Sequence, residues 1–320
     1  MNTSLVIGAG GQDGTLLAEL LVQRGDRVVG VAREKTWCAT GGPWDPVDIL
    51  HAGEVAELVR ETQPAECYYL PAFHHSAEDG GLRLDDAALF TKSHAVHVQG
   101  LLHFLHAVAE HSPATRLFYA ASSHVFGTPA GQPQDEATPL NPENIYGITK
   151  TMGILCCRYF RRERGVFAAT GILYNHESPL RPLKFLSQKI VRGVLAFQRN
   201  PAKKLVLGDL NAVVDWGYAG DYVEAMTRIL GQATAQDFVV ATGEPHTVGE
   251  FLQIACELAG VDWRECVETN PGLLRKKPVV LIGNSRRLRQ ATGWAPQVSF
   301  RELIALMLTA ARACGSEGEA

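Results

Sequence analysis

The sequence predicts an α/β fold, a Rossmann-type doubly wound parallel sheet with a smaller C-terminal lobe. Short apolar runs alternate with amphipathic stretches over the first 173 residues, which is typical of repeated β–α–β units. The first apolar run, residues 4–7, leads into a glycine-rich segment at residues 8–14 (GAGGQDG), and an amphipathic helix is expected at residues 15–24. A glycine turn between a strand and a helix lets backbone N–H groups approach a pyrophosphate. We therefore predict that this turn binds a dinucleotide.

The second strand is expected at residues 27–31, and in a doubly wound sheet its tip lies beside the adenosine ribose. Arg33 follows this tip, and an arginine there can pair with a 2′-phosphate. NADP is therefore the predicted cofactor, whereas NAD is possible if Glu34 meets the ribose instead. Residues 36–46 are expected to form a loop. Residues 47–49 are expected to form a short third strand, which would place Asp48 near the adenine amino group.

The next elements continue the alternation of helix and strand. We expect a helix at residues 53–61, a fourth strand at residues 67–70 and, at residues 71–76, a turn that lies under the cofactor. A long helix with an early break is expected at residues 85–110.

Histidines are frequent in this region, but they do not predict a metal site. His74 and His75 are sequence neighbours, whose side chains point apart in an extended segment. His103 and His106 share a helix face but have no acidic or cysteine partner nearby. We therefore expect no metal.

Three residues that can carry proton chemistry follow the fifth strand, which is expected at residues 116–120. Ser122 stands at the carboxyl end of that strand, where doubly wound folds bind ligands. Tyr146 and Lys150 are four residues apart on a helix expected to run to about residue 164, so they share a face. A lysine ammonium in this position can lower the pKa of the phenol and hold a ribose hydroxyl.

After a sixth strand at residues 166–173, a polar turn at residues 174–179 is expected to face the cleft. We expect residues 1–173, together with about 209–245, to bind the cofactor, and residues 174–208 and 246–320 to form the smaller lobe. The remaining expected elements are strands at residues 203–208 and 237–241 and helices at residues 220–230, 248–259 and 300–313.

Composition narrows the class of protein. The net charge of −4 argues against a nucleic-acid partner. Seven scattered cysteines without a C-x-x-C pair are typical of reduced thiols. The N-terminus has no signal-peptide pattern, and no apolar run approaches the ~20 residues of a membrane helix. We therefore expect a cytoplasmic protein with no membrane partner.

These landmarks resemble the extended short-chain dehydrogenase/reductase superfamily and, within it, the GDP-mannose 4,6-dehydratases. The resemblance covers nearly the whole chain. The matching stretches are Gly11-Gln12-Asp13-Gly14, Tyr146-Gly147 with Lys150, residues 171–179 (GILYNHESP), Asp215-Trp216-Gly217, residues 221–226 (DYVEAM) and residues 241–244 (ATGE).

The resemblance implies a reaction at the sugar 4-OH. Tyr146 would take the proton from this hydroxyl while a hydride passes from C4 to the nicotinamide, and Ser122 would hydrogen-bond the same oxygen. Lys150 would hold the nicotinamide ribose. In a dehydratase a glutamate then removes the C5 proton, water leaves from C6, and the hydride returns to C6.

The resemblance also implies the binding residues and the assembly. Besides Tyr146 and Lys150, the expected cofactor contacts are Gly8, Gly11, Gln12, Asp13, Gly14, Arg33, Asp48, Ile49, Leu70 and Ala72. The expected contacts to the nucleotide sugar are Ser123, Asn175, Glu177, Lys189 and Arg275. A homodimer is expected, formed by the helices that contain residues 97–110 and 146–164 of each subunit.

Three residues depart from the family pattern. His124 stands at the position of the glutamate, Val214 replaces an arginine that meets the nucleotide diphosphate, and His97 replaces an asparagine near the active site. A neutral imidazole can serve as a base, so His124 is a candidate catalytic residue. Three functions therefore stay open: a 4,6-dehydratase, a nucleotide-sugar 4-ketoreductase or epimerase without elimination, and a non-catalytic dinucleotide-binding regulator.

Overall fold

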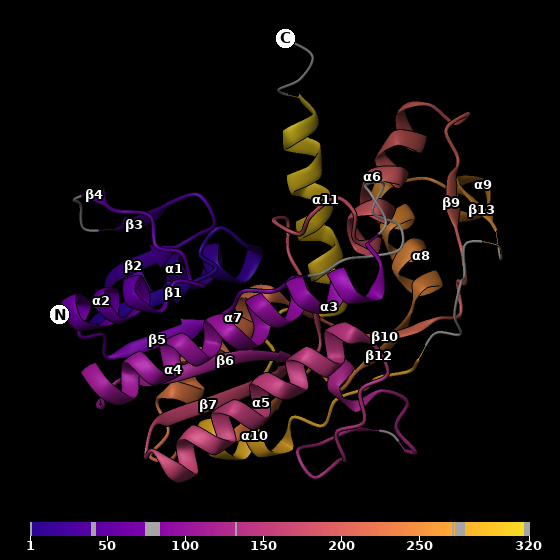
Figure 1. Ribbon diagram of the computed structural model, residues 1–320. Coiled ribbons are helices and arrows are strands. Elements are labelled where there is room, and N and C mark those ends of the chain that lie inside the picture. Colours follow the sequence, from indigo (N-terminus) through magenta and orange to yellow (C-terminus); the bar gives the residue numbers. More distant parts are fainter. Residues whose placement is uncertain are drawn as a thin grey trace.

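A large twisted sheet forms the centre of the protein (Figure 1). The computed structural model describes residues 2–39, 43–73, 84–131, 133–270, 272 and 279–316. The strands of this sheet are β1 (Thr3–Ile7), β2 (Arg27–Val31), β3 (Thr36–Cys38), β4 (Pro43–Trp44), β5 (Glu66–Tyr69), β6 (Arg116–Ser122), β7 (Phe167–Leu173) and β11 (Asp237–Val240). Their order is β11-β7-β6-β5-β1-β2-β3-β4. All pairs from β11 to β2 are parallel, which confirms the predicted Rossmann-type sheet.

The edge beyond β2 differs from the prediction. The expected loop at residues 36–46 contains β3 and β4, which pair antiparallel, and the expected third strand at residues 47–49 is absent from these described residues. Trp37 of β3 lies directly over Gly30, where a Cβ would come within 2.4 Å of the indole. β3 therefore occupies the edge of β2 that a third parallel strand would take.

Helices cover both faces of the sheet. One face carries α2 (Ala52–Thr62), α4 (Gly100–His111) and α5 (Ile145–Glu163), whose apolar side chains pack into one core with the strands. The other face carries α1 (Gln12–Gln23), α7 (Ala219–Leu230) and α10 (Arg286–Thr292) over a second core. In Figure 1, α4 and α5 lie along the same side of the sheet.

The expected break in the long helix is a π-helical turn. This turn, Ala95–Gln99, joins α3 (Asp86–His94) to α4. The hydroxyl of Tyr69 donates to the carbonyl of Val96 at 2.6 Å, and that of Tyr119 contacts the carbonyl of His97 at 3.5 Å. Buried tyrosines of β5 and β6 thus contact carbonyls that the wider turn releases.

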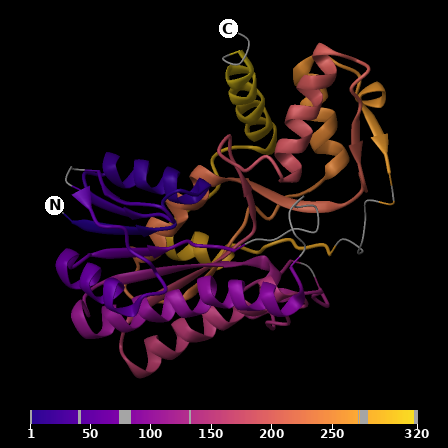
Figure 2. The same ribbon diagram turned by 45° about the horizontal axis from the view of Figure 1, so that its top comes forward.

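A smaller lobe packs around a third core (Figure 2). Its helices are α6 (Leu186–Arg199), α8 (Val248–Ala259), α9 (Trp263–Cys266) and α11 (Phe300–Ser316), and β9 (Leu205–Leu207) pairs with β13 (Val267–Thr269). Trp216 of the Asp-Trp-Gly motif packs on Phe251 and Phe300 in this core. The sequence analysis did not predict α6, α9, α10 or β13.

A short sheet joins the lobe to the main sheet. It consists of β8 (Asn175–Glu177), β10 (Val213–Tyr218) and β12 (Pro245–Thr247), in the order β12-β10-β8. Asp215 of β10 is buried and accepts hydrogen bonds from the backbone N–H groups of Thr242, Gly243 and Gly283. This carboxylate therefore holds together two loops that enter the lobe.

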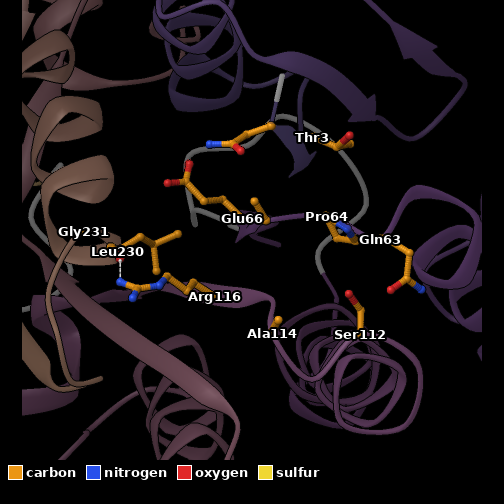
Figure 3. A pocket seen from close by; sticks show the side chains of 11 residues that line it. Thr3, Gln63, Pro64, Glu66, Ser112, Ala114, Arg116, Leu230 and Gly231 are labelled. Atoms are coloured by element: carbon orange, nitrogen blue, oxygen red, sulfur yellow. Dashed lines mark hydrogen bonds between the residues drawn. The ribbon is translucent and has the colours of Figure 1, made fainter.

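A cavity of about 560 Å³ lies at the amino-terminal edge of the main sheet (Figure 3). Arg116 in its wall donates to the carbonyls of Leu230 and Gln232 at 2.6 and 2.7 Å. Parallel sheets bind ligands at the opposite, carboxyl edge, so this cavity is not the candidate site. Among the described helices, none is both long and apolar enough to cross a bilayer.

Candidate active site

The glycine-rich turn between β1 and α1 is tight enough that side chains would obstruct it. Gly8 has a φ of +87°, and a Cβ there would lie 3.1 Å from the backbone nitrogen of Pro71. A Cβ on Gly14 would come within 2.3 Å of the carbonyl oxygen of Gly8. Gly11 caps α1 without a side-chain hydrogen bond, so no capping side chain occupies the N–H groups of its first turn. This cradle fits the pyrophosphate of a dinucleotide.

The side chains of Gln12 and Asp13, both predicted cofactor contacts, bind the polar turn after β7. Asp13 lies 2.9 Å from Nε2 of His176, and Gln12 donates to the backbone carbonyl of His176 at 3.1 Å. Ser178 donates to Oε1 of Gln12 at 2.8 Å. The segment predicted as a turn forms strand β8 over Asn175–Glu177 and lies against the glycine-rich segment, although these contacts were not predicted.

His176 is positively charged in this arrangement. Its Nδ1 lies 2.7 Å from the carbonyl of Tyr174 and its Nε2 faces the carboxylate of Asp13, so both ring nitrogens must donate. Burial opposes the charge, but Asp13 outweighs this effect and raises the pKa of His176. Burial likewise disfavours the carboxylate of Asp13, yet His176 lowers the pKa of Asp13 below its ordinary value.

The region predicted to hold the adenosine is open. Arg33 is exposed on the turn between β2 and β3. A hollow of about 430 Å³ lies beside the glycine turn, and its wall includes Gly10, Ala32 and Lys35. Lys35 was not among the predicted contacts, although it lies only two residues beyond Arg33.

The other predicted adenosine contacts have protein partners or stay solvent-accessible. Asp48 accepts a hydrogen bond from the N–H of Leu50 at 2.9 Å, in a turn just before α2. The carbonyl of Ile49 bonds Nδ1 of His103 at 2.9 Å. Leu70 is half-buried at the end of β5, and Ala72 is exposed. His74 and His75 lie outside the described residues.

Ser122, Tyr146 and Lys150 meet at the carboxyl edge of the sheet. Ser122 ends β6, and its hydroxyl forms a hydrogen bond with the phenol of Tyr146 at the start of α5. Burial raises the pKa of Tyr146 to about 12. Nζ of Lys150 lies 5.9 Å from the centre of the Tyr146 ring and donates to the carbonyl of Ala120 at 2.7 Å. Burial lowers the pKa of Lys150 to about 7.

His124 lies beside Tyr146 and is solvent-exposed. Its ring meets the Tyr146 ring edge-on, with 5.8 Å between the centres. Surrounding protein atoms lower the pKa of His124 by desolvation. The structure thus brings together all four predicted catalytic residues, and their roles stay predictions.

His97, in the π-helical turn, contacts two segments next to this site. The N–H of Phe73 donates to Nε2 of His97 at 2.8 Å, so Nδ1 carries the proton and donates to the hydroxyl of Thr149 at 2.8 Å. Thr149 in turn donates to the carbonyl of Ile145 at 3.0 Å. His97 therefore connects the turn after β5 to the first turn of α5, which carries Tyr146.

The predicted substrate contacts are more scattered. Asn175 is exposed at the start of β8, Ser123 is buried after β6, and Lys189 is half-buried on α6. Glu177 is buried and accepts a hydrogen bond from Ser187 at 2.6 Å. Arg275 lies outside the described residues.

Arg181 is a site residue that the sequence analysis missed. Its Nε lies 3.2 Å from the carboxylate of Glu177, and its guanidinium lies 3.6 Å from the centre of the Phe185 ring. Its positive charge favours the ionised forms of Tyr146 and Asp13, although burial still raises the pKa of Tyr146. Arg181 follows the polar turn in an irregular segment, where no periodicity marks it.

A Rossmann-type sheet that carries a serine, a tyrosine and a lysine at its carboxyl edge defines an enzyme of the extended short-chain dehydrogenase/reductase class. The family model for GDP-mannose 4,6 dehydratase matches residues 5–307. The chain belongs to the GDP-mannose 4,6-dehydratase family.

One curated relative agrees with this assignment, and two solved structures share the fold. GDP-mannose 4,6 dehydratase 1 of Arabidopsis thaliana is 35% identical over 95% of this chain and 88% of its own length. RMD from Pseudomonas aeruginosa, solved in complex with NADPH, has a TM-score of 0.81 at 19% identity, over 98% of this chain and 100% of its own. The dTDP-glucose 4,6-dehydratase DesIV from Streptomyces venezuelae, solved with NAD and TYD, has a TM-score of 0.83 at 20% identity, over 98% of both chains.

Proposed function

We propose that this protein is an NADP-dependent enzyme that oxidises and reduces C4 of a GDP-linked sugar. The single observation that carries the proposal is the cluster of Ser122, Tyr146 and Lys150 at the carboxyl edge of the sheet, next to the glycine turn. The GDP-mannose specificity in the name of the 35% identical plant relative supports the choice of nucleotide.

The protein residues supply the proton chemistry. Tyr146 takes the proton of the sugar 4-OH, and Ser122 hydrogen-bonds the same oxygen as it becomes a ketone. Burial disfavours the charged ammonium of Lys150. A ribose hydroxyl and an anionic pyrophosphate nearby favour the charged form, and the charge then lowers the pKa of the Tyr146 phenol. The nicotinamide, when bound, supplies the hydride acceptor and donor.

Charge on the turn after β2 supports NADP over NAD. Arg33 and Lys35 both lie on this turn, and Lys35 lines the hollow beside Gly10. A 2′-phosphate carries charge that such cations can pair with, whereas a free 2′-OH is better met by an acidic residue. Glu34 lies between the two cations, and NAD is the alternative if its carboxylate meets the ribose.

Arg181 supports binding of a nucleotide diphosphate. Val214 stands where the family pattern has an arginine for this contact, and β10 therefore offers no cation there. Arg181 is a fifth exposed and its charge acts on the Tyr146 phenol, so its guanidinium can meet an anionic substrate. We propose that Arg181, Lys189 and Arg275 supply the positive charge that binds the diphosphate, in place of the arginine that Val214 replaces.

Two fates of the 4-ketone define two candidate reactions. Membership of the family favours 4,6-dehydration, in which a base removes the C5 proton, water leaves from C6 and the hydride returns to C6. His124, in place of the glutamate, favours the second candidate, which lacks elimination: a 4-ketoreductase that takes a hydride from NADPH to C4, or an epimerase that returns the hydride to C4.

Product analysis separates the two candidates. Purified enzyme is incubated with GDP-mannose and NADP, and the 4-keto-6-deoxy product is detected by its absorbance in alkali. Accumulation of this product identifies a dehydratase. NADPH consumption on a GDP-linked 4-keto sugar, without any 4-keto product from GDP-hexoses, identifies a reductase. Inactivity with GDP-linked, dTDP-linked and UDP-linked sugars alike would refute the proposed function.

We also propose a homodimer through the face formed by α3, α4 and α5. Ile148, Leu155 and Tyr159 are 37%, 52% and 53% exposed and follow one stripe of α5, and Phe90 of α3 is 38% exposed. Burial of this stripe against a second copy would remove it from water. Light scattering tests the proposed dimer. Wild type should be dimeric, and a Leu155→Glu, Tyr159→Glu double variant should be monomeric.

The free thiols support a reducing compartment, and we propose the cytoplasm. Cys67, Cys157, Cys256 and Cys266 are buried thiols that form no disulfide.

A further inference from the structure

Asn144 bridges the start of α5 to His124 through both ends of its amide. Oδ1 of Asn144 accepts a hydrogen bond from the N–H of Gly147 at 2.8 Å. A backbone N–H can only donate, so this contact sets which end of the amide is oxygen. The amide nitrogen Nδ2 therefore faces Nδ1 of His124, at 3.3 Å.

This contact determines where His124 carries its proton. An amide nitrogen can only donate, so Nδ1 of His124 must accept, and the neutral ring holds its proton on Nε2. Nε2 has no hydrogen-bond partner within the described part of the chain, and the side chain is open to solvent beside Tyr146. Desolvation lowers the pKa of His124, which agrees with a neutral ring.

We propose that Asn144 is a positioning residue that holds His124 as a hydrogen-bond donor through Nε2 rather than as a base. The contrast with His176 is informative, because that ring faces a carbonyl and a carboxylate and is charged. His124 faces an amide N–H instead. The geometry at Asn144 thus selects one of two neutral tautomers.

The consequence for catalysis rests on the proposed function. Removal of the C5 proton needs a lone pair directed at the sugar, but the selected tautomer presents an N–H. Elimination must then wait until the proton moves from Nε2 to Nδ1, which breaks the bond from Asn144. The N–H on Nε2 is instead suited to donate a hydrogen bond to a sugar oxygen.

Two variants of Asn144 test the assignment. Asn144→Asp keeps an oxygen for the N–H of Gly147 and replaces the Nδ2 donor by an acceptor, so Nδ1 of His124 should become protonated. Asn144→Ser keeps a helix-capping oxygen, but its shorter side chain withdraws the donor from Nδ1 of His124, so both tautomers should be populated. The tautomer is measured on substrate-free enzyme by long-range ¹H–¹⁵N NMR with ¹⁵N-labelled histidine. The His124→Gln spectrum identifies the His124 signals.

We expect wild-type His124 to be protonated on Nε2 and the Asn144→Asp ring to carry a proton on Nδ1. An Nδ1-protonated wild type, or an Asn144→Asp ring that keeps its proton on Nε2 alone, would overturn the proposal. If Asn144→Asp does not fold, an unchanged Asn144→Ser spectrum would also overturn it. These readouts need no substrate, so a failure of the proposed function leaves them interpretable.

A second readout links the tautomer to the reaction. Deuterium exchange at C5 of a GDP-linked 4-keto sugar in ²H₂O measures how fast a base removes the C5 proton. We expect exchange to be about tenfold faster in Asn144→Asp than in wild type, because a lone pair then faces the sugar. Equal exchange rates in these two proteins, together with an altered NMR tautomer, would show that His124 does not act at C5.

Discussion

Asp13 and His176 lie 163 residues apart in the sequence, and their side chains meet at 2.9 Å. The contact joins the start of α1 to β8, and the His176 ring stacks on Tyr222 with 4.5 Å between the centres. The glycine turn and the polar turn after β7 are therefore held as one unit. The cofactor cradle depends on a residue that no local pattern around the cradle reveals.

This pair should stabilise the fold more at acidic than at alkaline pH. The pKa of His176 is raised in the folded protein, so its contribution is complete below the ordinary histidine pKa of about 6.5 and is lost as the pH rises through the folded value. We expect Asp13→Asn to lower the free energy of unfolding by about 1–3 kcal/mol at pH 6 and by less at pH 9.

The measurement is thermal unfolding of wild type and variant at both pH values. Glu54→Gln is the matched control, because Glu54 and His51 form an exposed pair at 3.5 Å that should contribute little. A loss of stability in Asp13→Asn that does not diminish between pH 6 and pH 9 would show that His176 is not charged.

Gly14→Ala should weaken cofactor binding. The added Cβ would lie 2.3 Å from the carbonyl oxygen of Gly8, so the turn must open. We expect NADPH affinity, measured by fluorescence titration, to fall at least about tenfold. Gly131→Ala is the control, because a Cβ there meets nothing within 4 Å. Unchanged affinity in Gly14→Ala would place the cofactor elsewhere.

Tyr146→Phe should remove activity and leave cofactor binding intact. The substitution deletes only the hydroxyl that Ser122 contacts, and general acid–base catalysis contributes on the order of 10²–10⁴ in rate. Turnover is measured with GDP-mannose and with a GDP-linked 4-keto sugar, and NADPH titration serves as the control. If the biological activity survives this change in full, the protein acts as a dinucleotide-binding regulator.

The buried Lys150 should make the nucleotide-free protein more stable as the pH rises. Burial lowers the pKa of Lys150 from 10.5 to about 7, so between these values the unfolded chain binds a proton that the folded chain does not. Stability therefore rises with pH through this window. Lys150→Met removes this proton. From pH 7 to 9.5 the free energy of unfolding of wild type should therefore rise by up to roughly 3 kcal/mol relative to that of the variant. Parallel pH profiles of the two melting temperatures would refute this.

The sequence predicts the parallel sheet and the cluster at its carboxyl edge, because both depend on local patterns. Ser122 ends an apolar strand, and Tyr146 and Lys150 have helical spacing, so their meeting follows from the topology of parallel strands. The prediction of a third strand at residues 47–49 was wrong. Nothing local to these residues shows that β3 already occupies the edge of β2.

The missed site residues share a different cause. Asn144 resembles an ordinary helix cap, and only its second contact, to His124, gives it a further role. Arg181 lies in an irregular segment, and its importance comes from its contact with Glu177 and its charge effect on Tyr146 rather than from spacing. Such contacts between distant parts of the chain leave no periodic trace in the sequence.

The most direct test of the account is the fate of a deuterium label at C4. GDP-mannose and GDP-6-deoxymannose, each deuterated at C4, are incubated with NADP and either wild type or Tyr146→Phe, and the sugars are analysed by mass spectrometry and NMR. Wild type should move deuterium from C4 of at least one sugar to C6 in a dehydratase or to the cofactor in a reductase, or should invert C4 with the label kept in an epimerase, and Tyr146→Phe should do none of these. Retention of both the label and the configuration at C4 of both sugars with wild type, or an equal change with Tyr146→Phe, would contradict Tyr146-dependent hydride transfer at C4.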